Sequence, residues 1–376
     1  MLELLFLLLP IAAAYGWFYG RNSLRKEELK GKANVAKNLS SGLNFLLTDQ
    51  EDKAIEQLLQ LLDIEAATID TYLALANLFR RRGDWDKAIR IHEKLHHLKL
   101  PKLQAQQIQL ELANDYFSAG LYDRAEKLLA ELVQAEQLRE KTLKLLFTLF
   151  IATHEWHKAV SYSHEVDKTD SKSLRIAIAN MRCLDTQKPL DAFSLRLLSQ
   201  QYPQAIRPKF ELAQLLLKQQ LPEEAAVAFK AVLQQKPQWA AEILPGLAQC
   251  QLPSAEWYQL LSQLAHKHKN ITATIYLADW LVQTGSPAAG EQLLLEKLQQ
   301  KPNIRLFERL LQLRQMTEPE HRDALFSVAQ LVHAYLETKI LFSCRNCGFK
   351  TRQTYWLCPS CQQWETVEPI SGIDGR

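Results

Sequence analysis

The sequence is poor in the residues that build loops and in the motifs that mark active sites. Its 376 residues include 12 glycines, 14 prolines and 3 methionines, and this composition favours helices joined by few sharp turns. It contains no glycine-rich phosphate-binding loop and no Gly-x-Ser-x-Gly nucleophile elbow. We therefore expect a mostly α-helical protein that is not an enzyme.

An excess of one charge is also lacking. The 45 lysines and arginines exceed the 42 aspartates and glutamates by three, whereas nucleic-acid binders usually carry a strongly basic face. We expect no nucleic-acid partner. Cysteine is sparse, with six in the chain. Cys183 and Cys250 stand alone in apolar surroundings, where single thiols act as small hydrophobic side chains.

The other four cysteines form two Cys-x-x-Cys pairs, Cys344 with Cys347 and Cys358 with Cys361. The two-residue spacing lets one tight turn aim both sulfurs at a common point, and two such turns complete a tetrahedron. Gly348 supplies the positive φ that the first turn needs. A pair of disulfides and four idle thiols are the alternatives. We predict one metal ion held by all four thiolates, as suits a reducing compartment.

Residues 341–369 around these cysteines form a short, aromatic-rich segment, and residues 351–357 alternate in the manner of a small β-hairpin. Tyr355, Trp356 and Trp364 are expected to cover the metal. So short a segment cannot build a stable core, so the metal must supply much of its folding free energy. Zinc and iron both suit four thiolates. The short spacing between the two pairs favours zinc in a structural role over a redox iron.

The N-terminus contains one long apolar run. Residues 2–19 read LELLFLLLPIAAAYGWFY and carry one charge, Glu3. As a helix this run would be about 27 Å long, close to the thickness of the hydrocarbon core of a bilayer. A cleaved signal peptide is the alternative, because alanines 12–14 resemble a cleavage site. Basic residues follow the run and do not precede it, which favours a transmembrane anchor (1–20) and a basic linker (21–38), with the N-terminus outside and the rest cytoplasmic.

Residues 39–338 repeat with a period near 34. The clearest copy is Ala76-x-x-Phe79-x3-Gly83-x4-Ala88, in which small residues let two helices approach and the glycine ends the first helix. The pattern resembles the tetratricopeptide repeat, and it predicts seven to nine helix pairs stacked in a solenoid. One residue, usually small, marks each copy: Ala54, Ala88, Ala125, Ala159, Ala192, Ala225, Trp257, Gly290 and Ala324.

First helices line the inner surface of such a solenoid, and the position two before the aromatic mark projects from it. A polar row there suits peptide binding, although any solvated helix face is polar as well. We interpret the arginines at 80–82 as a solvated helix end, where cations complement the helix dipole. The candidate partner-binding residues are Asn77, Asn114, Thr148, Gln214 and Asp279.

The stretches MLELLFLLLP, GLYDRAE, AIRIH and YWLCPSCQQW, with the PISGIDG tail, resemble the lipopolysaccharide assembly protein B family from end to end. The resemblance implies an inner-membrane anchor, a cytoplasmic repeat array and a rubredoxin-like domain in which the four cysteines are essential metal ligands. It implies an adaptor that promotes degradation of the deacetylase that commits precursor to lipid A. The implied partners are that deacetylase, the membrane-bound ATP-dependent metalloprotease, and an inner-membrane protein that senses lipopolysaccharide.

The expected fold is thus mostly α, a tetratricopeptide-repeat solenoid with an N-terminal transmembrane helix and a small C-terminal rubredoxin-like or zinc-ribbon module. A short tail, 370–376, follows the module. Two other functions stay open. One is a redox module in which iron passes electrons, and the other is a membrane-tethered scaffold for lipopolysaccharide assembly complexes without a link to proteolysis.

Overall fold

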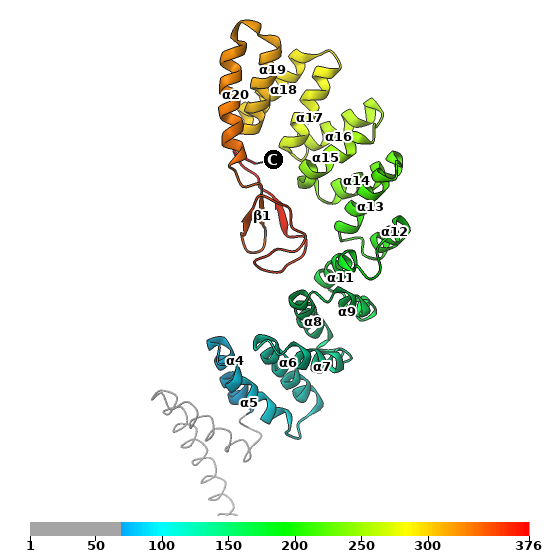
Figure 1. Cartoon of the computed structure of the whole chain (residues 1–376), viewed down its shortest axis with the longest axis vertical. Coiled ribbons are helices and arrows are strands. Elements are labelled where there is room, and N and C mark those ends of the chain that lie inside the picture. The colour runs from blue at the N-terminus through cyan, green and yellow to red at the C-terminus, as the bar shows by residue number, and fades with distance from the viewer. Residues whose placement is uncertain (1–68, 376) are drawn as a thin grey trace, which may run out of the picture. The chain divides into compact units, whose positions relative to one another are not determined.

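The computed structural model describes residues 69–375, which are helical up to Glu337 apart from short connections (Figure 1). The predicted anchor and linker, and the first repeat mark Ala54, lie outside the described residues. Among residues 69–375, no helix is both long and apolar enough to cross a bilayer. The chain divides into two compact units, Met1–Thr142 and Leu143–Arg376, which we describe in turn.

The described part of the first unit consists of two helix pairs. They are α4 (Ile69–Arg82) with α5 (Trp85–His96), and α6 (Lys102–Ser118) with α7 (Tyr122–Leu132); α6 also packs on α5. Ala76, Phe79 and Ala88 are fully buried where α4 meets α5. Small side chains at the crossing let the two helices approach, and the aromatic ring fills the space beside them, as the repeat pattern predicted.

The second unit continues the helical pairs and ends in a small sheet. Its core is continuous from Leu195 to Leu277 and includes the fully buried Trp239. Its helices are α8 (Arg139–Thr153, from Leu143 on), α9 (Trp156–Ser161), α10 (Ser163–Asp167), α11 (Lys172–Leu184), α12 (Ala192–Gln201), α13 (Arg207–Lys218), α14 (Pro222–Gln235), η2 (Pro237–Trp239), α15 (Ala240–Gln249), α16 (Ser254–His266), α17 (Ile271–Gln283), α18 (Pro287–Gln300), α19 (Ile304–Thr317), η3 (Pro319–His321) and α20 (Arg322–Glu337).

The predicted repeat marks fall at one structural position in most copies. Ala88, Ala125, Ala159, Ala225, Trp257 and Gly290 are each the fourth residue of their helix. Gly290 has a steric reason, because a Cβ there would lie 2.9 Å from the Ala278 carbonyl oxygen of the facing helix. Ala192 and Ala324 differ. They are the first residue of α12 and the third of α20. Ala192 is half-buried against the core and Ala324 is exposed, so neither occupies the position of the other marks.

The turn inside a pair can keep its shape where the glycine is missing. Gly83 ends α4 at φ +87°, and the Asp84 N–H donates to the Phe79 carbonyl at 3.0 Å. In the turn between α13 and α14, the position that corresponds to Gly83 is Gln220, at φ +61°. The Leu221 N–H there donates to the Leu216 carbonyl at 3.0 Å. A glutamine in this left-handed conformation costs about 1–2 kcal/mol more than a glycine. The helix packing on either side maintains the turn at that cost.

The chain ends in a three-stranded antiparallel sheet in the order β2-β1-β3, with β1 at Phe342–Cys344, β2 at Lys350–Thr351 and β3 at Val367–Pro369. The hairpin predicted over 351–357 is wrong in its position, because β2 stops at Thr351 and the hairpin forms with β1. The residues after it leave the sheet and pack on the repeats.

Candidate metal centre and the surface it packs on

Each Cys-x-x-Cys pair forms one tight turn, and the two turns share a geometry. In the first, the Gly348 N–H donates to the Cys344 carbonyl at 2.9 Å, and Gly348 has φ +76°. In the second, the Gln362 N–H donates to the Cys358 carbonyl at 2.9 Å, and Gln362 has φ +53°. The sequence predicted the glycine of the first turn, but a glutamine at the matching place gave no such signal.

The four sulfurs converge within 4.8 Å of one another. The Sγ atoms of Cys344 and Cys361 are 3.7 Å apart, and so are those of Cys347 and Cys358. A metal bound to four thiolates at about 2.3 Å has sulfur–sulfur edges of about 3.8 Å. The residues therefore fit one tetrahedrally held ion, and the shared Fe–S and Zn–S chemistry leaves both metals compatible.

The surroundings of the thiols differ from one to the next. Burial raises the pKa of Cys344, but hydrogen bonds, chiefly the one between its sulfur and the Thr366 hydroxyl, outweigh burial and lower the pKa to about 6. The backbone N–H of Phe349 lowers the pKa of Cys347. Burial raises the pKa of Cys358. A bound cation offsets the cost of burying a thiolate, so the donor set suits a metal better than four free thiols.

Here the metal module denotes residues 341–369. It is attached to the repeats by one buried carboxylate, that of Glu365, which is 5% exposed. Its Oε1 and Oε2 accept from the Ile206 N–H at 2.9 and 3.0 Å, and Oε1 also accepts from the Arg207 N–H at 3.1 Å. The Asn180 side-chain amide donates to it at 2.9 Å. Glu365 thus caps the N-terminus of α13, where N-cap Ile206 has no side-chain acceptor.

Burial raises the pKa of Glu365, and the hydrogen bonds from Asn180, Arg207 and Ile206 oppose that rise. The carboxylate is compensated mainly by N–H dipoles.

The expectation that the tryptophans cover the metal is wrong, because they face the repeats. Trp356 stacks on Trp239 with ring centroids 4.9 Å apart, and Phe210 lies 5.7 Å from it. Trp364 meets Trp156 edge-on at 6.3 Å. These aromatic contacts anchor the module in the core of the second unit.

The tail returns to the array at α19. The Ile304 N–H donates to the Ile373 carbonyl at 2.8 Å. The Asn303 side-chain amide donates to the carbonyls of Gly372 and Gly375 at 2.9 and 3.1 Å. The N-terminus of α19 therefore holds residues 372–375, and the module is connected to the array at both of its ends.

The predicted partner-binding residues lie in both units, and their role in binding stays a prediction. In the first unit, Asn77 is half-buried and accepts from Arg80, and Asn114 is half-buried. In the second, Thr148 and Gln214 line two different clefts. Asp279 forms an ion pair with Arg309 at 2.5 Å, so a residue of the array already occupies its carboxylate.

The interpretation of arginines 80–82 as a solvated end is wrong for Arg80. Its guanidinium bonds the buried Asp115 carboxylate at 2.8 Å and Glu111 at 2.6 Å, and its side chain is 16% exposed. The Asp115 carboxylate also bonds the Nδ1 of His92, which is fully buried. The repeat pattern gave no signal of this network, because its members lie on three helices.

The sequence also contains one motif typical of zinc-binding helices that is not among the predicted sites. His92-Glu93-Lys94-Leu95-His96 has the His-Glu-x-x-His spacing of zinc protease helices. In the structure His92 bonds Asp115, and Glu93 accepts from the Tyr116 hydroxyl at 2.6 Å. Within residues 69–375, the four cysteines are the one group of three or more such ligands that converges. The motif is therefore part of the repeat core.

Comparison with known proteins gives consistent matches. Residues 342–369 match a family model described as a rubredoxin metal binding domain, and residues 71–104 match the tetratricopeptide repeat. Lipopolysaccharide assembly protein B of Escherichia coli strain K12 is 32% identical over 394 residues that cover 100% of both chains. The protein of the same name from Haemophilus influenzae is 32% identical over 99% of each. A solved structure, "Crystal structure of MamA protein", covers 47% of this chain and 96% of its own, with a TM-score of 0.34 and 18% identity.

Proposed function

The chain belongs to the lipopolysaccharide assembly protein B family, and we propose that it is a non-enzymatic adaptor that regulates lipopolysaccharide biosynthesis at the bacterial inner membrane. The observation that carries the proposal is the identity to relatives of that name over their full length, from the apolar N-terminal run to the cysteine module. The name of those relatives supports a role in lipopolysaccharide assembly.

In the proposed mechanism, the adaptor brings the lipid A-committing deacetylase to the membrane-bound ATP-dependent metalloprotease, which degrades it. A transmembrane anchor at residues 1–20 would raise the effective concentration of the pair at the membrane. The repeat array would supply the contact surfaces, with Asn77, Asn114, Thr148, Gln214 and Asp279 as candidate contacts. An inner-membrane protein that senses lipopolysaccharide would restrain the adaptor.

The metal has a structural part in this proposal. Cys344, Cys347, Cys358 and Cys361 would hold one ion, with zinc favoured over iron, and the ion supplies folding free energy to the module when bound. Four thiolates fill a tetrahedral site and leave no open position for a substrate. Two residues of the folded module then attach it to the repeat array, since Glu365 caps α13 and Trp356 packs on Trp239.

The test measures the half-life of the deacetylase in cells that contain the full chain, no chain, or the chain without residues 1–20. We expect rapid turnover with the full chain only, while the truncated chain keeps its helical circular dichroism. Unchanged turnover without the chain would refute the adaptor function and leave the scaffold function. Metal analysis of the purified protein separates zinc from a reversibly coloured redox iron.

A further inference from the structure

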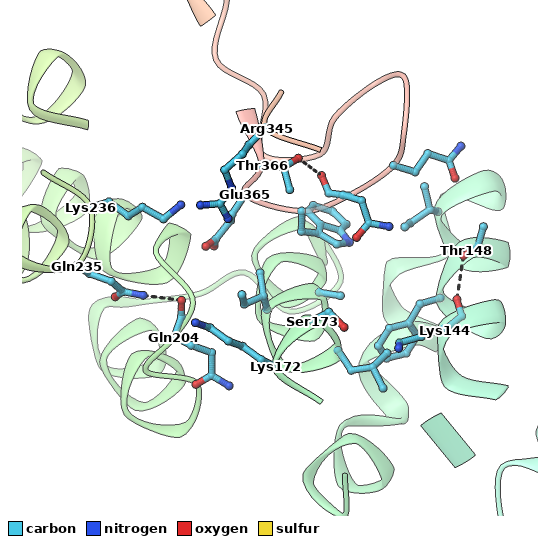
Figure 2. Close-up of a pocket in the computed structure, with 18 residues that line it drawn as sticks. Lys144, Thr148, Lys172, Ser173, Gln204, Gln235, Lys236, Arg345, Glu365 and Thr366 are labelled. Atoms are coloured by element: carbon cyan, nitrogen blue, oxygen red, sulfur yellow. Dashed lines mark hydrogen bonds between the residues drawn. The ribbon is translucent and has the colours of Figure 1, made fainter. Parts of the chain in front are cut away.

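A cleft of about 570 Å³ lies within the second unit, between the metal module and the repeat helices α8 and α11 (Figure 2). Residues 362–366 and Arg345 of the module form one side, and the helices form the other. Its volume falls in the range of sites that bind ligands, about 300–1,000 Å³. The cleft exists only where the module packs against the array, so neither part contains it alone.

The charge around the cleft is predominantly positive. Four of its lining residues are cationic, Lys144, Lys172, Lys236 and Arg345, whereas Glu365 is the one acidic residue among them (Figure 2). The Glu365 carboxylate is already bonded to three N–H donors of the array. A second carboxylate nearby, Glu368, pairs with Lys236 and lies 3.8 Å from Arg345. Two carboxylates thus lie among the four cationic residues that line the cleft.

The N-terminus of α11 adds to this field. Lys172 is the first residue of α11, and Ser173 also lines the cleft. No acidic residue occupies the first turn of α11, and its N-cap Ser171 makes no side-chain capping hydrogen bond. The partial positive charge of the helix end therefore lies at the same cleft as the lysine ammonium groups.

The remaining lining residues are amides, hydroxyls and apolar side chains. Amide side chains, such as those of Gln204 and Gln363, can both donate and accept hydrogen bonds, and the half-buried Ile176 supplies apolar surface together with Trp364, which is 9% exposed. A phosphate group only accepts hydrogen bonds and is best held by the planar fork of arginine. Three of the four cations here are lysines. An extended peptide offers donors, acceptors and apolar side chains together, and so matches the whole lining.

We propose that this cleft binds an acidic peptide segment of a partner protein, with its carboxylates on Lys172 and Arg345 and its apolar side chains on Ile176 and Trp364. This inference deepens the adaptor function and rests on it for the identity of the occupant as a protein. Because one wall belongs to the metal module, peptide binding depends on the metal. The metal then acts on partner recognition without touching the partner.

The test uses fluorescence anisotropy on the full chain in detergent micelles. The probe is a fluorescein-labelled hexapeptide of sequence DLELDE, and its uncharged counterpart NLQLNQ is the matched control. We expect DLELDE to bind, with an affinity that falls as salt is added, and NLQLNQ not to bind. Equal binding of the two peptides would overturn the proposal.

Variants locate the site. The double substitution Lys172→Gln and Arg345→Gln should weaken DLELDE binding about five- to tenfold, as expected for the loss of two exposed ion pairs. The matched pair Lys267→Gln and Lys301→Gln, exposed lysines elsewhere in the second unit, should leave it unchanged. Equal affinities in both double variants would overturn the proposal, provided that their melting temperatures match that of the parent.

Two further arms test the occupant and the metal. Millimolar inorganic phosphate or phosphatidylglycerol vesicles should not displace the peptide beyond the effect of equal ionic strength, and selective displacement would assign the cleft to phosphate groups instead. Chelation of the metal should abolish binding, and retained affinity would place the peptide elsewhere. These arms need no deacetylase, so the adaptor function and the cleft can fail separately.

Discussion

Two buried carboxylates, one in each unit, are compensated in different ways. Asp115 in α6 is fully buried and meets formal cationic or ionisable partners, Arg80 of α4 and His92 of α5. Glu365 of the metal module is 5% exposed and meets N–H dipoles at the start of α13 and the amide of Asn180. The first links neighbouring repeats. The second links residues 159 positions apart in the chain.

The two kinds of partner determine whether each contact can break without unfolding of the repeats. An ion pair buried among the packed helices of neighbouring repeats has no way to separate without unfolding those repeats, and removing one partner is costly. A carboxylate that caps a helix from a separate module can leave as a unit with that module, since water then satisfies both sides. The Asp115 network is thus a fixed part of the core, whereas Glu365 is a contact that depends on whether the module is folded.

The largest expected effect comes from removing the metal ligands. Replacing Cys344 and Cys347 by Ser should unfold the module, because structural four-ligand zinc sites supply about 10–16 kcal/mol of apparent binding free energy. Hydrogen exchange measured by mass spectrometry should then show lost protection over residues 341–369 and at the start of α13, with α4–α6 unchanged. Replacing the isolated Cys250 by Ser serves as the control. Full protection of the module in the double variant would contradict the metal's role.

The next effect concerns the ion pair. Asp115→Ala should lower the free energy of unfolding by about 3–5 kcal/mol, because it leaves Arg80 largely buried beside an empty site. Chemical denaturation followed by circular dichroism measures this loss. Asp123→Ala, at an exposed carboxylate in α7, should change it by no more than about 0.5 kcal/mol. A loss equal to that of Asp123→Ala would show that the network contributes nothing.

A smaller effect is expected at the capping carboxylate. Glu365→Ala should cost about 1–3 kcal/mol, because the Ile206 and Arg207 N–H groups lose their acceptor. Glu365→Gln keeps one carbonyl acceptor and removes a buried charge, so it should cost less than Glu365→Ala. Hydrogen exchange at the first turn of α13 reports both. If the two substitutions cost the same, the helix cap is not what holds the module.

The smallest effect tests the other end of the same helix. Gln220→Gly should stabilise the array by about 0.5–1 kcal/mol, since it relieves a left-handed glutamine after α13. The reverse change at a matching turn, Gly120→Gln, should destabilise by a similar amount, because Gly120 has φ +77°. Both are read from denaturation midpoints. A destabilising Gln220→Gly would mean that its side chain makes a contact worth more than the strain.

Local patterns in the sequence were enough to predict the helical repeats and the cysteine cluster. Ala76, Ala88 and Gly83 have their roles within one helix pair, and the Cys-x-x-Cys spacing encodes a single turn, so each is readable over a few residues. The turn at Gln220 was not readable, because packing on both sides overrides the preference of the residue.

Contacts between distant segments left no such pattern. Glu365 follows the last cysteine as an ordinary acidic residue, and nothing in its neighbourhood points to a helix end 159 positions earlier. The sequence favours Trp356 as a cover for the metal because it lies in the same short segment as the cysteines, but in the structure Trp356 stacks on Trp239 in the larger apolar core. Arg80 was read as solvated because its partners, Asp115 and Glu111, belong to the next repeat.

Because the tail returns to α19, the metal module lies between two attachments to the repeat array. It leaves the array after Glu337 and comes back where the Ile304 N–H meets the Ile373 carbonyl. A module that loses its metal therefore stays attached to the array at both ends. Its renewed packing on the array is a first-order event whose rate does not depend on protein concentration. Loss and recovery of the metal should accordingly be a repeatable local cycle. A bulky tag fused to the C-terminus should disturb the contact between the tail and α19 and slow the refolding of the module.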